Sequence, residues 1–181
     1  MAAEYHFVTN WSITGTAHEV AEVLGDPTGL ARWWPSVYLD VREIEPGDPE
    51  TRVGRVIDLY TKGWLPYTLR WRFKVTESRG AAGFTLVATG DLVGSGVWTL
   101  TQHGEIVDVQ YDWRITADKP LLRYGTFIFR PIFSANHHWA MARGEESLNL
   151  ELRRRRAKSE MERRAVPTSP GPTFTRQRTT S

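Results

Sequence analysis

The chain of 181 residues contains no cysteine, which excludes a disulfide framework, a zinc–thiolate site and a cysteine nucleophile. No apolar run approaches the ~18 residues that a transmembrane helix needs, so we expect no membrane span. The N-terminal stretch MAAEYHFVTNW has neither a basic start nor an apolar core, so we expect no signal peptide. Together these absences predict a cytoplasmic protein.

Motifs of several enzyme classes are also missing. There is no GxSxG and no HExxH. The glycine-rich stretch GDLVGSG is not followed by a strand-to-helix turn, which excludes a phosphate-binding loop. His137 and Met141 stand at i and i+4, but no second histidine or carboxylate joins them at that spacing, so we expect no metal site. We expect no cofactor either.

The net charge of +2 is unevenly distributed along the chain. Residues 151–181 hold nine Lys/Arg and three Asp/Glu, a net charge of +6, whereas residues 1–150 hold fourteen and eighteen, a net of −4. A slightly acidic body is a poor platform for a phosphate backbone, so we expect no nucleic-acid partner.

Seven short segments alternate between apolar and polar residues, which is typical of strands with one buried face. In EIVDVQYDWRI, for example, Val109, Tyr111 and Trp113 share one face, and Asp108 and Arg114 share the other. The connections are too short for parallel crossovers, so we expect an antiparallel sheet with one side in water. We predict strands at residues 5–13, 37–45, 53–62, 67–77, 83–91, 95–103 and 105–116.

Two short helices are predicted after the first strand. Thr16 and Glu19 form a capping box, T-A-H-E, that begins one of them. Asp26, as N-cap before Pro27, begins the next, which ends before Pro35.

The longest helical pattern runs from residue 131 to residue 156. Its apolar stripe, with steps of three or four, consists of Phe133, His137, Ala140, Met141, Gly144, Leu148 and Leu152. Glu145, Glu146 and Glu151 are expected to face largely away from that stripe. Arg153–Arg156 load the helix end where cations suit the dipole, and we expect a solvated end there.

The segments around this helix complete the expected organisation. A short helix is predicted over residues 118–127, and Pro131 is expected to kink or restart the helix. From Ala157 the composition becomes polar and basic, which predicts a disordered tail over 157–181 behind one domain over 1–156.

This order of elements is that of the helix-grip fold, and the local sequence agrees with it. DPTGLARWWPSV, KGWLPYTLRW, ATGDLVGSGVW, VQYDWRI and RPIFSANHHWAMARGEESL resemble the polyketide cyclase/dehydratase and lipid-transport branch of the START-like (SRPBCC) superfamily. The resemblance covers about residues 4–156. It implies an α+β fold, in which a seven-stranded antiparallel sheet curls around a long C-terminal helix with an apolar cavity between them.

Aromatic and small side chains from both walls are candidates for binding a ligand in such a cavity. They are Trp34, Trp64, Tyr67, Leu69, Trp71, Trp98, Trp113, Phe133, Asn136, Ala140, Met141 and Gly144. Small residues on the helix stripe, Ala140 and Gly144, are expected to leave room beneath it. The alternative is that the rings fill a solid core.

Four residues are candidates for catalysis: His137, Tyr111, Asp91 and Arg70. His137 falls on the inward stripe, where a neutral imidazole acts as a base or a hydrogen-bond donor. Asp91, turned inward at a bulge together with Arg70 or Arg114, would give a polar anchor or an acid–base pair. The alternatives are a core histidine satisfied by one neighbour and surface charges that cap turns.

Three functions compete on this basis. The first is binding of a hydrophobic or polycyclic small molecule by a monomer or homodimer, driven by apolar burial. The second is an enzyme of the polyketide cyclase/dehydratase type that positions such a molecule in the same cavity. The third is an interaction module whose basic tail docks on an acidic partner.

Overall fold

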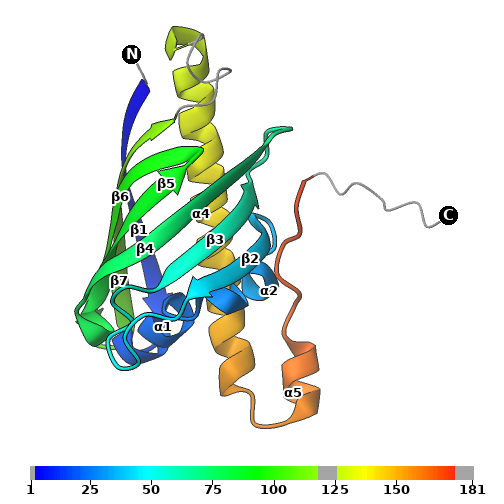
Figure 1. Cartoon of the computed structure of the whole chain (residues 1–181). Coiled ribbons are helices and arrows are strands. Elements are labelled where there is room, and N and C mark those ends of the chain that lie inside the picture. Colours follow the sequence, from blue (N-terminus) through cyan, green and yellow to red (C-terminus); the bar gives the residue numbers. More distant parts are fainter. Residues whose placement is uncertain (1–2, 118–125, 174–181) are drawn as a thin grey trace, which may run out of the picture.

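The computed structural model describes residues 3–117 and 126–173, and it forms one curved sheet wrapped around a long helix (Figure 1). The strands are β1 Ala3–Thr14, β2 Tyr38–Glu45, β3 Val56–Lys62, β4 Thr68–Ser78, β5 Gly83–Gly90, β6 Leu92–His103 and β7 Ile106–Ala117. They pair antiparallel in the order β1-β7-β6-β5-β4-β3-β2. The predicted seven-stranded antiparallel sheet is thus confirmed.

The alternation in the sequence explains which face of the sheet is buried. In β7, Val109, Tyr111 and Trp113 are buried, whereas Asp108 and Arg114 on the opposite face are exposed. Because side chains alternate across a strand, this pattern lines the concave face with apolar groups and leaves the convex face to water.

Two helices and a 3-10 turn follow β1. In α1 (Ala17–Leu24) the capping box is complete, since Thr16 and Glu19 each accept a hydrogen bond from the other's backbone N–H. Next come η1 (Pro27–Gly29) and α2 (Leu30–Trp33). Asp26 precedes Pro27 as expected, but its carboxylate accepts a hydrogen bond from the Thr28 hydroxyl and does not cap the backbone.

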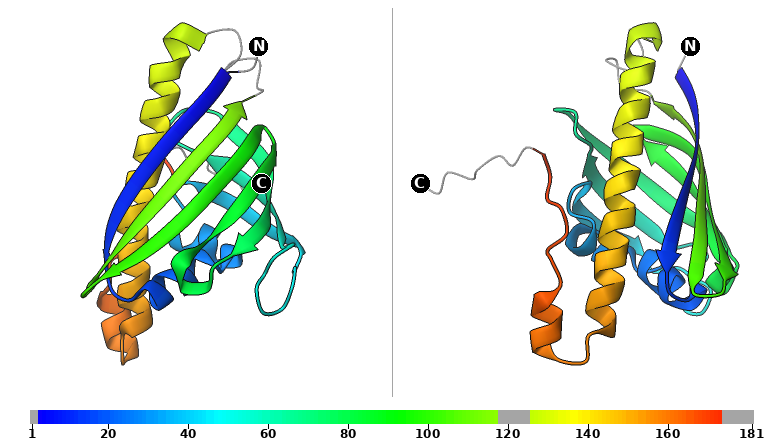
Figure 2. Two further views of the ribbon diagram at one scale, coloured as in Figure 1. Left: turned by 90° about the vertical axis from the view of Figure 1, so that its left-hand side faces the viewer. Right: turned by 180° about the vertical axis from the view of Figure 1, so that it is seen from behind.

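Helix α4 (Thr126–Arg156) runs along the open side of the sheet and is continuous through Pro131 (Figure 2). The expected restart of the helix at Pro131 is therefore wrong. Pro131 is the sixth residue of α4, so its missing N–H removes one backbone hydrogen bond near the N-terminal end, and the helix continues past it. The short helix predicted over 118–127 falls mostly on residues outside those described.

Charged residues at the end of α4 hold the helices together. The Glu151 side chain is only 2% exposed and receives two hydrogen bonds from Arg32, at 2.8 and 2.9 Å, and one from Arg155 at 3.0 Å. Arg156 pairs with Glu19 of α1 at 2.8 Å. The expectation that Glu151 faces outward is therefore wrong, and so is that of a simply solvated end for Arg154, Arg155 and Arg156, which pair with Glu151 or Glu19.

The segment after α4 folds back along the molecule (Figure 2). Where the sequence predicts a disordered tail, residues Glu160–Ala165 form helix α5, whose N-cap Ser159 accepts a hydrogen bond from the backbone N–H of Glu162. Further along, the Arg154 guanidinium donates to Ser169 at 3.4 Å, and the Thr173 hydroxyl lies 3.5 Å from the carbonyl oxygen of Trp64.

Among the residues that the structure describes, no helix is long and apolar enough to cross a membrane.

Candidate ligand-binding site

The concave face of the sheet carries a continuous wall of aromatic rings. The centroids of Trp71 and Trp113 lie 5.7 Å apart, and Trp113 stacks on Tyr111 at 5.4 Å. Tyr111 stacks in turn on Trp98, with a centroid distance of 4.0 Å and an interplanar angle of 15°. These rings come from β4, β6 and β7 and form a continuous apolar surface on the side of the sheet that faces α4.

Trp34, the residue after α2, closes the space opposite this wall. Its ring lies 5.7 Å from that of Trp11 and 5.2 Å from that of Tyr38. It also fills the room above Gly144, because a Cβ built on that glycine would lie 2.3 Å from the indole. The open space predicted beside Gly144 is therefore absent, because Trp34 occupies it.

A cavity of about 100 Å³ remains between the aromatic wall and α4. Of the residues proposed from sequence, it is lined by Trp34, Leu69, Trp71, Tyr111, Trp113, Phe133, Asn136, His137, Ala140 and Met141. A second hollow of about 60 Å³ lies beside it and has Trp98 in its wall. Five residues belong to both walls, namely Trp34, Tyr38, Trp71, Tyr111 and Met141. The side chains of these five residues separate the two hollows.

Two polar contacts fix the cavity's rim. The indole N–H of Trp71 donates to the hydroxyl of Thr61 over 3.0 Å. The side-chain oxygen of Asn136 accepts a hydrogen bond from the backbone N–H of Leu65 at 3.2 Å, and the amide lies directly against Gly63. Asn136 therefore holds the β3–β4 loop against α4.

His137 lies on α4, and its ring packs against β1 at the edge of the cavity. Its ring stacks on Phe7 with centroids 4.1 Å apart, and its Nε2 lies 3.4 Å from the hydroxyl of Thr9. Burial, aided by the nearby His138, lowers the pKa of His137 to about 4. At neutral pH its imidazole is therefore uncharged and a weak base.

The tyrosines in the cavity wall are also uncharged at neutral pH. Burial raises the pKa of Tyr38, and it raises the pKa of Tyr111 well above its usual value. The buried indole N–H of Trp34 has no hydrogen-bond partner in the described part of the chain. Buried polar groups normally have partners, so this donor is available to a ligand.

The structure places several predicted site residues away from the cavity. Asp91 accepts a hydrogen bond from the backbone N–H of Arg70 at 2.8 Å, and the Arg70 guanidinium lies over the Tyr60 ring on the exposed face. They do not form the inward pair considered from sequence. Trp64 is 37% exposed on the β3–β4 loop. Tyr67 is half-buried near Tyr5. Its pKa is raised to about 12, mainly by burial and to a smaller extent by the Tyr5 hydroxyl.

Three polar residues that were not among the predicted site residues also line the cavity: Tyr38, Thr61 and Lys62. Thr61 continues the inward alternation of Ile57 and Leu59, which is the signal that could have found it. Within the ranges 3–117 and 126–173, no three His, Asp or Glu side chains gather as a metal would need.

A seven-stranded antiparallel sheet gripping a long C-terminal helix, with short helices after the first strand, defines the START-like, helix-grip fold. No family model matches the chain, and no curated protein matches its sequence.

Solved structures with this fold match most of the chain. The Zhui aromatase/cyclase from Streptomyces sp. R1128 is 20% identical, with a TM-score of 0.67 over 87% of this chain and 99% of its own. The di-domain ARO/CYC StfQ from the steffimycin biosynthetic pathway is 17% identical, with a TM-score of 0.58 over 77% and 48%. Ara h 8.0201 is 10% identical, with a TM-score of 0.56 over 83% and 98%. At these identities the likeness shows the fold alone.

Proposed function

We propose that this protein binds a flat, hydrophobic or polycyclic small molecule between the sheet and α4. The observation that carries this proposal is the continuous row of contacting rings, Trp71, Trp113, Tyr111 and Trp98, along the sheet beside a cavity. Burying a flat apolar ligand against such rings gains about 25 cal/mol per Å² of surface removed from water.

The ligand needs more room than either inner hollow alone. Ligand pockets typically measure roughly 300–1,000 Å³, whereas the two hollows are about 100 and 60 Å³. Together they hold only about 160 Å³, so the rings of Trp34 and Tyr38 must turn away from Trp71 and Tyr111 both to join the hollows and to free further space. Binding is therefore expected to move Trp34 off Gly144.

The polar groups around the cavity favour binding over acid–base catalysis. A histidine with a pKa of about 4 is far from the operating pH at which a general base works best. The phenols of Tyr38 and Tyr111 keep their protons and act as hydrogen-bond donors. Such neutral donors suit the carbonyl and hydroxyl groups of an uncharged ring system.

A fluorescence titration with 1,8-dihydroxyanthraquinone tests the proposal. We expect saturable quenching of tryptophan emission, and loss of that quenching in Ala140→Phe, whose ring fills the cavity from α4. Ala142→Phe is the matched control, because Ala142 is exposed on the same helix. Equal quenching in both variants, with circular dichroism showing both folded, would remove the cavity as the binding site.

A second candidate is a cyclase/dehydratase-type enzyme that acts on such a ligand in the same cavity. The likeness of the fold to two aromatase/cyclases favours it. In that case the wild-type protein turns over a linear polyketone, and Tyr111→Phe weakens ligand binding by roughly 2- to 12-fold, the effect of one lost hydrogen bond, and abolishes turnover. No turnover by the wild-type protein would leave binding as the function, and unchanged turnover in Tyr111→Phe would remove Tyr111 from the mechanism.

We place this activity in the cytoplasm, in a monomer or homodimer without a nucleic-acid partner. The acidic body of the chain supports the lack of a nucleic-acid partner, because it would repel a phosphate backbone. Size-exclusion chromatography with light scattering tests the oligomeric state, and a species larger than a dimer would contradict it.

A further inference from the structure

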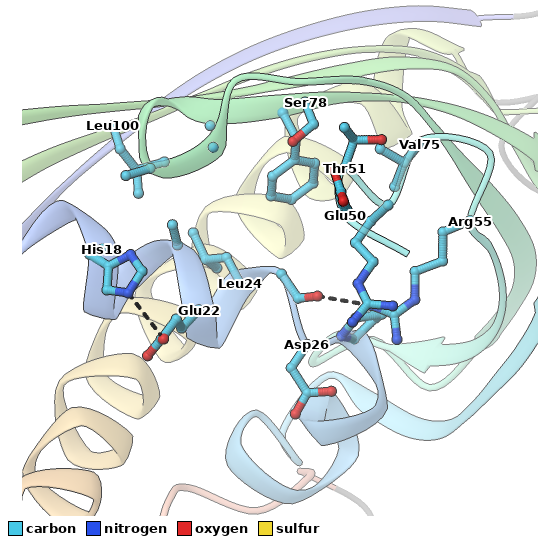
Figure 3. A pocket seen from close by; sticks show the side chains of 18 of the residues that line it. His18, Glu22, Leu24, Asp26, Glu50, Thr51, Arg55, Val75, Ser78 and Leu100 are labelled. Atoms are coloured by element: carbon cyan, nitrogen blue, oxygen red, sulfur yellow. Dashed lines mark hydrogen bonds and ion pairs between the residues drawn. The ribbon is translucent and has the colours of Figure 1, made fainter. Parts of the chain in front are cut away.

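A larger pocket lies at the other end of the concave face, where α1 and η1 cover the sheet (Figure 3). Its volume is about 500 Å³, against about 100 Å³ for the cavity beside α4. The β2–β3 loop, residues 46–55, and the β4–β5 turn close its sides. This size falls within the range of roughly 300–1,000 Å³ that is typical of small-molecule sites.

The floor of this outer pocket is apolar. It consists of Leu24 from α1, Phe73 and Val75 from β4, Phe84 from β5 and Leu100 from β6. Leu24, Phe73 and Phe84 also line the 60 Å³ hollow, so they form the partition between the outer pocket and the interior. No residue that lines the outer pocket also lines the cavity beside α4.

The rim of the outer pocket is held by a network of polar contacts. Arg55, with a side chain only 11% exposed, pairs with Glu43 and donates to the carbonyl oxygen of Gly25 at 2.9 Å. It thereby ties the β2–β3 loop to the end of α1. In the same loop, Asp48 accepts hydrogen bonds from the backbone N–H groups of Glu50 and Thr51, and Arg52 is held at a φ of 63°. A non-glycine residue rarely adopts this conformation, so the loop is strongly constrained.

Carboxylates dominate the charge around the opening. Glu22, Asp26 and Glu50 line it, together with Arg52, Arg55 and His18, whose ring lies 3.2 Å from the Glu22 carboxylate (Figure 3). The charge of Arg55 is already neutralised by Glu43, which does not line the pocket. The rim therefore repels anions and attracts cations.

We propose that the outer pocket is a second ligand-binding site, which takes an amphiphile with an apolar chain and a cationic amine head. The chain lies on Phe73, Phe84 and Leu100, and the ammonium group lies at the rim near Glu22 and Glu50. This site is separate from the cavity beside α4 and does not depend on what that cavity binds.

Calorimetric titration with three molecules of equal chain length tests this site, each kept below its aggregation concentration. Dodecylammonium is expected to bind about fivefold more tightly than dodecanol, the effect of one partly screened ion pair, and dodecanoate more weakly than either. The double variant Glu22→Gln/Glu50→Gln is expected to erase this preference. Equal or tighter binding of dodecanoate would overturn the proposal.

Two variants that fill the pocket locate the bound chain. Ala21→Trp from α1 and Ala81→Trp from the exposed β4–β5 turn both place an indole in the pocket, so each is expected to weaken dodecylammonium binding by at least about tenfold. Ala142→Trp, on the exposed side of α4, should leave it unchanged. Full affinity in Ala81→Trp, or loss of binding in Ala140→Phe instead, would place the chain elsewhere and refute the assignment.

Discussion

Replacing His137 by phenylalanine should make the protein more resistant to acid. The folded protein keeps this imidazole neutral down to a pKa of about 4, whereas an exposed histidine in the unfolded chain takes up a proton near 6.5. The unfolded state therefore binds more protons as the pH falls, and stability is lost between pH 6.5 and pH 4. Above pH 6.5 both states are neutral and the effect vanishes.

The magnitude follows from the two pKa values. Between pH 7 and pH 5, this one group lowers the free energy of unfolding by about 2 kcal/mol, and the full loss at lower pH reaches about 3 kcal/mol. Phenylalanine at this position stacks on Phe7 as the imidazole does, so the His137→Phe variant should keep its packing and lose the titration.

Urea denaturation at pH 7 and at pH 5 measures this difference. The wild-type protein is expected to lose about 2 kcal/mol between the two values beyond what His137→Phe loses. His138→Gln serves as the control, and it should retain most of the loss because burial is the larger cause of the shift. Parallel pH dependence in the wild-type protein and His137→Phe would refute the reasoning.

Three further perturbations have defined outcomes. Glu151→Ala removes the buried partner of Arg32. The loss in free energy of unfolding should be about 2 kcal/mol, which is below the range for fully buried pairs because Arg32 is 59% exposed. Urea denaturation measures it, and an unchanged midpoint would contradict this expectation. Gly144→Ala forces a methyl group against the Trp34 ring and should lower the free energy of unfolding by about 1–3 kcal/mol, although alanine favours helix. The near-ultraviolet circular dichroism should change as well, and a stabilised protein would show that Trp34 lies elsewhere. Deleting residues 158–181 should lower the melting temperature by only a few degrees, because α5 contains no buried residue. Such a shift corresponds to a loss of about 1 kcal/mol in the free energy of unfolding. Collapse of the fold would show that the tail is part of the domain.

The strands and first helices could be predicted because their signals are local. The alternation of Val109, Tyr111 and Trp113 sets the inward face of β7 without reference to any other segment. Likewise, Thr16 and Glu19 form their capping box within four residues of chain. Both features depend on neighbours in sequence, and both appear in the structure.

Features that depend on distant pairs could not be predicted in this way. Gly144 looked like open space, but Trp34, more than a hundred residues earlier, fills it. Glu151 looked like a solvated charge because the arginine that neutralises it comes from α2. The outer pocket escaped notice for the same reason, since α1, the β2–β3 loop and the ends of three strands each contribute only part of it.

A crystal structure of the protein with 1,8-dihydroxyanthraquinone bound tests the central claim most directly. The account predicts density for the ring system against Trp71, Trp113 and Tyr111, with the Trp34 indole turned away from Gly144. Density confined to the convex face of the sheet or to the outer pocket, with Trp34 still on Gly144, would contradict it.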